Sequence, residues 1–116
     1  MVAVDVSVVT FRPDLDLLAR LLASIGEQTA GLDVGVLIQD NSPEAGAVDR
    51  IRALAPLASA AFSRVEVTRS PSNVGFGRGH NLAIFDERGS AADYHLVLNP
   101  DVELDPDALR LCIDYL

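Results

Sequence analysis

The sequence predicts an α/β fold in which a mostly parallel, Rossmann-like sheet carries helices on both faces. Apolar runs of strand length alternate along the chain with amphipathic segments of helical length, and Gly, Pro, Asp or Asn separate them. Successive strand–helix–strand units produce parallel pairing through right-handed crossovers. Because this pattern continues along the whole chain, we expect a single domain over residues 1–116.

Four apolar runs rich in Val, Ile and Leu are typical of buried strands. They cover about residues 4–9, 34–38, 65–69 and 94–98. Four segments with apolar residues at helical spacing, or with a clear start and stop, indicate helices. They cover about residues 14–26, 47–54, 80–88 and 105–116, whereas residues 56–63 indicate no element.

Capping residues define where two of these helices should begin. Asp14 is expected to be the N-cap of the first helix. In the last helix, Asp105 is expected to be the N-cap with Pro106 at the first helical position. The lone cysteine, Cys112, falls on the apolar stripe of that helix and is expected to be a small buried residue.

The composition excludes several classes of protein. Hydrophobic residues make up 49% of the 116 residues and charged residues 22%, which is ordinary globular usage. A net charge of −8 argues against a nucleic-acid partner or an anionic membrane surface. A single cysteine excludes a disulfide framework and a cysteine-based metal cluster. We expect a cytoplasmic location, or a peripheral one at the inner face of the membrane for a full-length protein.

Polar residues follow each predicted strand, and they therefore share one edge of the sheet. They are Thr10 and Arg12, Asp40 and Asn41, the loop from Asn73 to Gly79, and Asn99 and Asp101. Ligands of open α/β folds bind at the carboxyl ends of the strands. Each group alone is ordinary turn chemistry, but four together predict an assembled site.

The residue types at this edge favour a phosphate ligand. Gly75, Gly77 and Gly79 allow backbone N–H groups to approach an oxyanion at the start of a helix. The spacing matches neither the dinucleotide fingerprint nor the Walker loop. Asp101 follows a strand that Pro100 ends, and it is placed to hold Mg²⁺ or Mn²⁺ against phosphates. Asp40 suits the hydroxyls or the imide of a nucleoside.

Five stretches, in their order and spacing, resemble the nucleotide-sugar-binding half of family 2 glycosyltransferases of the GT-A fold, and most closely the rhamnosyltransferase-like branch. They are residues 6–13 (VSVVTFRP), 24–29 (SIGEQT), 39–42 (QDNS), 73–81 (NVGFGRGHN) and 98–102 (LNPDV). The resemblance spans nearly the whole chain. It implies a donor site that contains Thr10, Arg12, Asp40, Asn73, Gly75, Gly77, Arg78, Asn81, Asn99 and Asp101.

The resemblance also implies a reaction and its partners. The donor is a nucleoside-diphosphate sugar of the dTDP-rhamnose or UDP-sugar type, and the acceptor is the hydroxyl of a saccharide or of a lipid-linked molecule. The family's Asp-x-Asp metal motif maps onto residues 99–101, where its first acid is replaced by Asn99, so Asp101 is the one carboxylate expected to bind the metal. A sugar nucleotidyltransferase and a non-catalytic nucleotide-binding or interaction module are the alternatives.

No residue in the sequence is convincing as the general base for transfer. His80 is expected to be a residue of the helix start, and His95 a packed, hydrogen-bonded residue of an inner strand. Glu103 is expected to be part of a capping turn, and the alternative is that it serves as a second metal ligand. We therefore expect a C-terminally truncated enzyme that binds donor, whose exposed apolar stripe on the last helix favours self-association.

Overall fold

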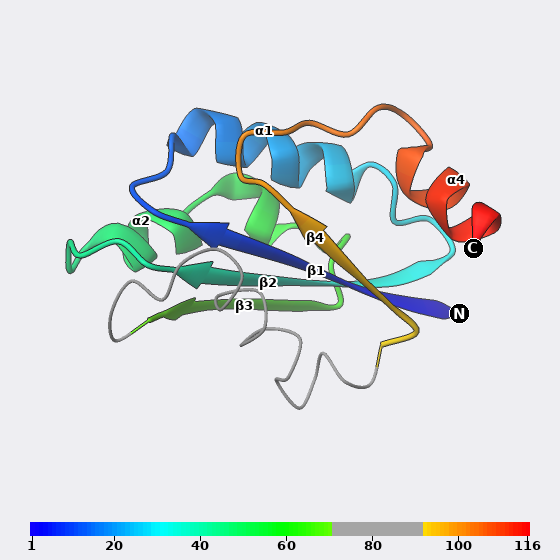
Figure 1. Cartoon of the computed structure of the whole chain (residues 1–116), viewed down its shortest axis with the longest axis horizontal. Helices are drawn as coiled ribbons and strands as arrows, with labels where there is room; N and C mark the ends of the chain where they lie inside the picture. The colour runs from blue at the N-terminus through cyan, green and yellow to red at the C-terminus, as the bar shows by residue number, and fades with distance from the viewer. Residues whose placement is uncertain (71–91) are drawn as a thin grey trace.

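The computed structural model describes residues 1–70 and 92–116. The strands of this part are β1 (Val2–Thr10), β2 (Leu32–Asp40), β3 (Arg64–Arg69) and β4 (Tyr94–Leu98). They form one sheet in the order β3-β2-β1-β4, and every pair of neighbours is parallel (Figure 1). The predicted α/β class with a parallel sheet is confirmed. Each predicted strand is present, and β1 and β2 extend further at both ends than the sequence indicates.

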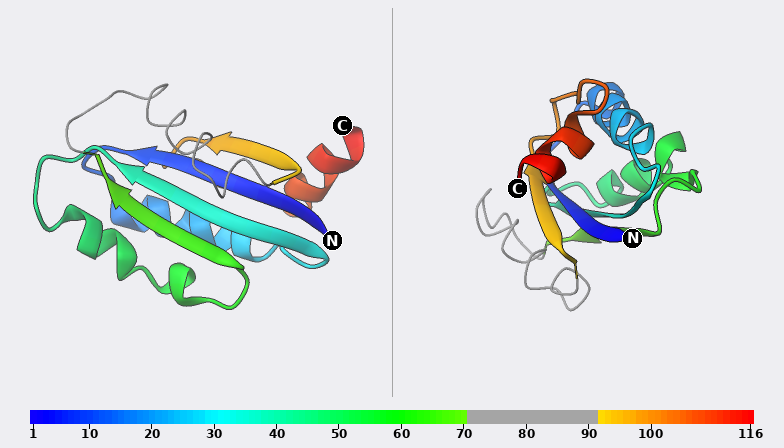
Figure 2. Two further views of the ribbon diagram at one scale, coloured as in Figure 1. Left: turned by 90° about the horizontal axis from the view of Figure 1, so that it is seen from below. Right: turned by 90° about the vertical axis from the view of Figure 1, so that its right-hand side faces the viewer.

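The helices of the described residues are α1 (Leu15–Gly26), α2 (Ala47–Arg52), the 3₁₀ helix η1 (Ala55–Ala58) and α4 (Ala108–Tyr115). Figure 2 shows α1, α2 and η1 on the same face of the sheet. α4 lies at the end of the sheet where the strands begin (Figure 1). The helix predicted over residues 80–88 falls outside the described residues.

Two predicted helix boundaries are wrong. The second helix ends at Arg52, because Leu54 is extended and Pro56 then sits in the first turn of η1. The last helix begins at Ala108, three residues after its predicted N-cap. Its N-cap is Asp107, which has a φ of 64° and makes no side-chain cap bond, because residues 105–108 form a separate turn.

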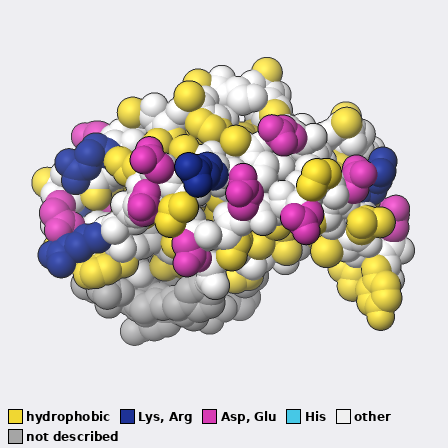
Figure 3. All heavy atoms as spheres, turned by 90° about the horizontal axis from the view of Figure 1, so that it is seen from above, with side chains coloured by type: hydrophobic (Ala, Val, Ile, Leu, Met, Phe, Trp, Pro, Cys, Tyr) yellow, Lys and Arg dark blue, Asp and Glu magenta, His cyan; other side chains and the backbone are white. Residues whose placement is uncertain are grey.

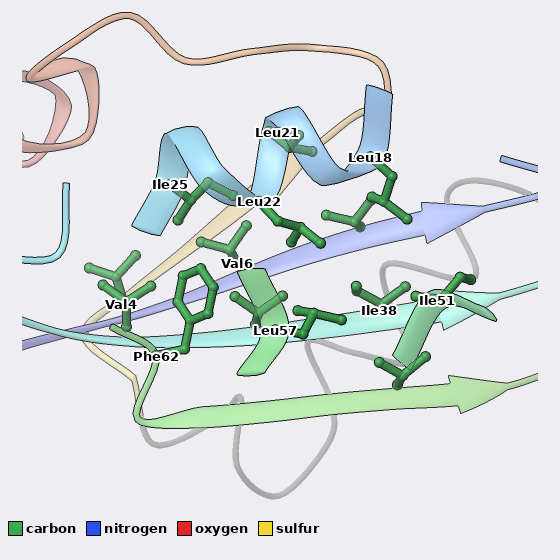
Figure 4. Close-up of a cluster of buried hydrophobic side chains, with 14 of the residues drawn as sticks. Val4, Val6, Leu18, Leu21, Leu22, Ile25, Ile38, Ile51, Leu57 and Phe62 are labelled. Atoms are coloured by element: carbon green, nitrogen blue, oxygen red, sulfur yellow. The ribbon is translucent and has the colours of Figure 1, made fainter. Parts of the chain in front are cut away.

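The core lies between the sheet and α1 (Figure 4). Leu18, Leu21, Leu22 and Ile25 of α1 are fully buried against alternate residues of the strands, such as Val6 of β1. Burial of each such side chain contributes roughly 1.5–3 kcal/mol. The Asp14 carboxylate caps α1 as predicted, since it accepts from the backbone N–H of Asp16 and of Leu17.

α4 contributes less to this core than its sequence pattern indicates. Leu109 is buried at 3% exposure, but Leu116 is 79% exposed. Cys112 is exposed as well, so its predicted burial is wrong. The face over α1 and the chain leading to α4 mixes acidic, basic and apolar side chains, and Figure 3 shows no continuous basic patch on its described part. Among the described helices, none is both long and apolar enough to cross a membrane.

Candidate functional site

β1 and β2 end side by side, so Thr10 and Asp40 are register partners at the carboxyl edge. Asp40 has 0% exposure. Its Oδ1 accepts hydrogen bonds from the Thr10 hydroxyl at 2.7 Å and from the Ser42 hydroxyl at 2.8 Å. Its Oδ2 is buried and has no hydrogen-bond partner among the described residues. A buried carboxylate oxygen left unpaired is costly, and this oxygen is therefore suited to accept from a ligand.

The loop after β2 is tied to both neighbouring strands. The Asn41 N–H donates to the Thr10 carbonyl, and the Ser70 N–H donates to the Asp40 carbonyl. The side chain of Asn41 is buried and accepts from the Ser70 hydroxyl at 2.5 Å. Asn41 therefore belongs to the scaffold beneath Asp40, and Asp40 is held in a fixed position.

Ser42 is a site residue that reasoning from the sequence missed. It donates to Asp40 Oδ1 and accepts from the Arg12 N–H at 2.7 Å, so it joins the loops that follow β1 and β2. The signal in the sequence is a serine two residues after an aspartate at a strand end, which is the spacing of a local side-chain turn.

Arg12 lies at the same edge, but Glu44 engages its side chain. Its backbone has a φ of 44°, in the left-handed region. Its Nε lies 2.6 Å from Glu44 Oε1, and its guanidinium lies 5.3 Å from the ring centroid of Phe11. A backbone hydrogen bond, and then Arg12 itself, lower the pKa of Glu44. A ligand anion would have to compete with Glu44 for this guanidinium.

Asn99 and Asp101 follow β4 at the opposite side of β1 from Asp40, and both are exposed. The described residues contain no group of three His, Cys, Asp or Glu side chains that could hold a metal ion. One exposed carboxylate nevertheless fits Mg²⁺, which keeps several waters and often binds through one or two carboxylates beside substrate phosphate. Five predicted site residues lie outside the described residues: Asn73, Gly75, Gly77, Arg78 and Asn81.

The face of the sheet opposite α1 carries a partly buried polar row that the sequence did not predict. Asp5 of β1 has 0% exposure and forms an ion pair with Arg64 of β3, which also lies 3.4 Å from Asp33. Gly35 of β2 lies between them in register and leaves room for the guanidinium. The pair raises the pKa of Arg64 above its usual value. This row joins β1 to β3 across β2.

His95 of β4 is the register partner of Asp5. Both ring nitrogens are buried without a hydrogen-bond partner in the described part of the chain, which differs from the predicted hydrogen-bonded imidazole. Burial lowers the pKa of His95, and the negative charge of Asp5 opposes that effect.

The chain matches the family model described as glycosyl transferase family 2 over residues 5–116. It belongs to glycosyl transferase family 2. The resemblance found in its sequence motifs is thereby confirmed at the level of the family, while the rhamnosyltransferase-like branch stays a prediction. No curated protein sequence matches the chain.

Two solved structures are similar to this family 2 chain in fold. The crystal structure of S. aureus TarS has a TM-score of 0.69 at 17% identity, over 99% of this chain and 19% of TarS. The structure of S. aureus TarS 1-349 has a TM-score of 0.60 at 18% identity, over 99% of this chain and 32% of that one. The chain thus spans less than a third of either protein, and the similarity is one of fold.

Proposed function

We propose that the chain binds a nucleoside-diphosphate sugar with Mg²⁺ or Mn²⁺, as the donor-binding part of an enzyme that transfers the sugar to an acceptor hydroxyl. The observation that carries the proposal is the state of Asp40. One oxygen of this buried carboxylate is saturated by two hydroxyl donors, and the other has no partner among the described residues. Such a group favours a ligand that presents an N–H or O–H donor.

The imide N–H of uracil or thymine is the donor that we assign to Asp40 Oδ2. A cytosine ring nitrogen at the same place has no hydrogen to give, so it would leave this oxygen unpaired. A site built around a buried polar group discriminates strongly against a ligand that lacks the matching donor. The proposal therefore favours uridine or deoxythymidine diphosphate sugars, including dTDP-rhamnose.

The sheet order supports a ligand that lies across the end of β1. β2, which ends at Asp40, and β4, which leads to Asp101, flank β1 on its two sides. With neighbouring strands about 4.8 Å apart, the two strand ends are about 10 Å from each other. An extended nucleotide, with its base at one end and its diphosphate at the other, suits that span.

Asp101 is the residue that we propose holds the metal, with Asn99 beside it as a neutral oxygen ligand. A bound divalent ion would offset the negative charge that grows on the diphosphate as it leaves the sugar. The acceptor is proposed to be a saccharide or a lipid-linked molecule, and the reaction to take place in the cytoplasm or at the inner face of its membrane.

Calorimetric titration with UMP, UDP, dTDP and CDP, with and without Mn²⁺, tests this function. We expect UDP or dTDP to bind more tightly with Mn²⁺ and CDP to bind poorly. Asp101→Asn should weaken Mn²⁺-dependent UDP binding by roughly 100-fold, the effect of losing a charged ligand, and leave UMP binding unchanged. Asp40→Ala should weaken both UMP and UDP.

Asp114→Asn is the matched control, because it removes the same charge from an exposed position on α4, away from the carboxyl edge. It should bind every ligand as the unmodified chain does. Equal binding of CDP and UDP would overturn the role given to Asp40. Undiminished Mn²⁺ dependence in Asp101→Asn would remove Asp101 from the metal site and direct attention to Glu103.

A further inference from the structure

The chain that leaves β4 passes over α1 before it reaches α4 (Figure 1). The side chains of Ser24, in α1, and of Gln28, in the turn just after α1, bind its backbone. The Ser24 hydroxyl accepts from the Leu104 N–H at 3.1 Å. The Gln28 amide donates to the Asp105 carbonyl at 3.0 Å and accepts from the Leu109 N–H at 2.8 Å. We call Ser24 and Gln28 the α1 clamp. Its partners lie 77 to 81 residues further along the chain.

Hydrogen bonds to backbone carbonyls of α1 hold both clamp side chains in place. The second N–H of Gln28 donates to the Ser24 carbonyl at 3.0 Å, so both amide hydrogens and the amide oxygen are engaged. The Ser24 hydroxyl donates to the Leu21 carbonyl at 2.7 Å while it accepts from Leu104, and Ser24 is only 7% exposed. Neither side chain can turn away without losing several bonds at once.

Gln28 of the clamp also caps α4 from the turn that follows α1. Asp107, the N-cap of α4, makes no side-chain cap bond of its own. Gln28 supplies the missing acceptor to the N–H of Leu109, one of the first backbone donors of the helix, which otherwise lack intrahelical partners. The start of α4 is therefore positioned by the turn after α1.

Asp101 lies in a short segment with both ends held. β4 pairs with β1 up to Leu98, and the clamp holds the backbone again at Leu104. Between these points, Val102 packs against the hydrophobic core. A stretch of five residues, 99–103, fixed at both ends has few conformations, whereas the same stretch attached only at β4 has many.

We propose that Ser24 and Gln28 are positioning residues for the metal-binding carboxylate, because they fix the path of the segment that carries Asp101. The inference rests on the proposed function, in which Asp101 holds the divalent ion. The hydrogen bonds of the clamp described above are all to the protein backbone, so its proposed effect on the metal is indirect. The clamp lowers the conformational entropy that Asp101 loses when the ion binds. Its removal should therefore weaken metal binding and leave nucleoside binding unchanged.

Mn²⁺ titration in the presence of UDP, followed by the electron paramagnetic resonance signal of free Mn²⁺, tests the inference on the full chain. Gln28→Met keeps the length of the side chain and removes its hydrogen bonds, and Ser24→Ala removes the hydroxyl. Each should raise the Mn²⁺ concentration for half-saturation by about tenfold, within the range known for groups that orient metal ligands. Metal-free UMP affinity should stay within twofold.

Two further variants separate positioning from a general loss of structure. Thr29→Val removes a hydroxyl that, among the described residues, bonds the Gly26 carbonyl at the same helix end, and it should leave Mn²⁺ affinity unchanged. Gln28→Glu keeps the acceptor for Leu109 but loses the donor to Asp105, so its Mn²⁺ affinity should lie between those of the unmodified chain and Gln28→Met. Retained UMP binding reports that each variant is folded.

Amide hydrogen exchange completes the test. In Gln28→Met, the N–H of Leu109 should exchange faster, because its acceptor is lost. If it does so while Mn²⁺ affinity is unchanged, the positioning role is wrong and the clamp is only structural. If the unmodified chain shows no Mn²⁺ dependence, or if Asp101→Asn keeps the full Mn²⁺ dependence of the unmodified chain, the proposed metal role of Asp101 fails and this inference fails with it. The two failures are thus distinguishable.

Discussion

Gly35→Ala should destabilise the fold through the buried ion pair between Asp5 and Arg64. A Cβ added at Gly35 would lie 2.5 Å from Asp5 Oδ1 and 2.6 Å from Arg64 Nη2, which no real Cβ tolerates. The Arg64 side chain, 27% exposed, can move outward toward solvent. Asp5 cannot follow, because its side chain is fully buried. The substitution therefore leaves a buried carboxylate without its cation.

The expected loss is about 2–3 kcal/mol of the free energy of unfolding. Breaking a buried ion pair by displacing one partner costs roughly 3–5 kcal/mol, and the partial exposure of Arg64 favours the lower end. Replacing Gly by Ala within a strand returns roughly 0.5–1 kcal/mol of conformational entropy. Out of a typical total of roughly 5–15 kcal/mol, the remaining loss is large enough to measure.

Urea unfolding measures this loss, and Gly26→Ala is the matched control. A Cβ at Gly26 would meet ordinary contacts, 3.6 Å from Phe62 Cζ and 3.8 Å from Ala61 Cβ, so we expect no loss of stability. Gly35→Ala should also cost much less in an Arg64→Met background, where no guanidinium occupies the space above it. A loss below about 1 kcal/mol, or full additivity with Arg64→Met, would refute the reasoning.

Two further predictions concern the candidate site and the polar row. Thr10→Val, which keeps the shape of the side chain, removes one of the two hydroxyl donors to the buried Asp40 and should cost about 2 kcal/mol in urea unfolding. For His95, a folded-state pKa below the ordinary 6.5 means that the unfolded chain takes up a proton first as the pH falls. Stability is therefore full above pH 6.5 and decreases below it, and in His95→Leu the urea midpoint should change less between pH 6.5 and 5.5.

For each of these two predictions, one experimental result would contradict it. A change below about 0.5 kcal/mol in Thr10→Val would mean that its hydroxyl bond to Asp40 contributes nothing to the folded state. An unchanged pH slope in His95→Leu would assign the slope to other groups. Ser7→Ala is avoided as a control on this face, because Ser7 makes an interaction of its own.

The parts of the fold that the sequence predicts well depend on neighbouring residues. The Val-rich run of β1 and the Asp14 cap of α1 need only a periodicity or a side chain that reaches its own backbone. The shared edge of Thr10 and Asp40 follows from the rule that parallel strands end together. These features therefore appear in the structure much as the sequence indicates.

The features that the sequence does not predict depend on contacts between distant segments. The sequence predicts the wrong start for α4, because the side chain that accepts from the Leu109 N–H belongs to Gln28, 81 residues before Leu109. The ion pair of Asp5 joins residues 59 positions apart, and neither local sequence contains a pattern that predicts it. Which of the two Asp40 oxygens is hydrogen-bonded likewise depends on the register of β1 and β2, and a strand pattern does not specify that register.

The Asp5–Arg64 pair also decides which alignments of β3 are permitted. β3 is an edge strand of the described sheet, and its hydrophobic signal is weak because Val65 is 37% exposed. A slip by one residue would turn Arg64 to the apolar face beneath the helices and leave Asp5 buried alone. A slip by two would carry Arg64 about 7 Å along the strand and away from Gly35. Glycine has no side chain, so Gly35 leaves the space in which the guanidinium crosses β2 to reach Asp5. A polar contact thus excludes misaligned sheets that hydrophobic burial at this edge would tolerate.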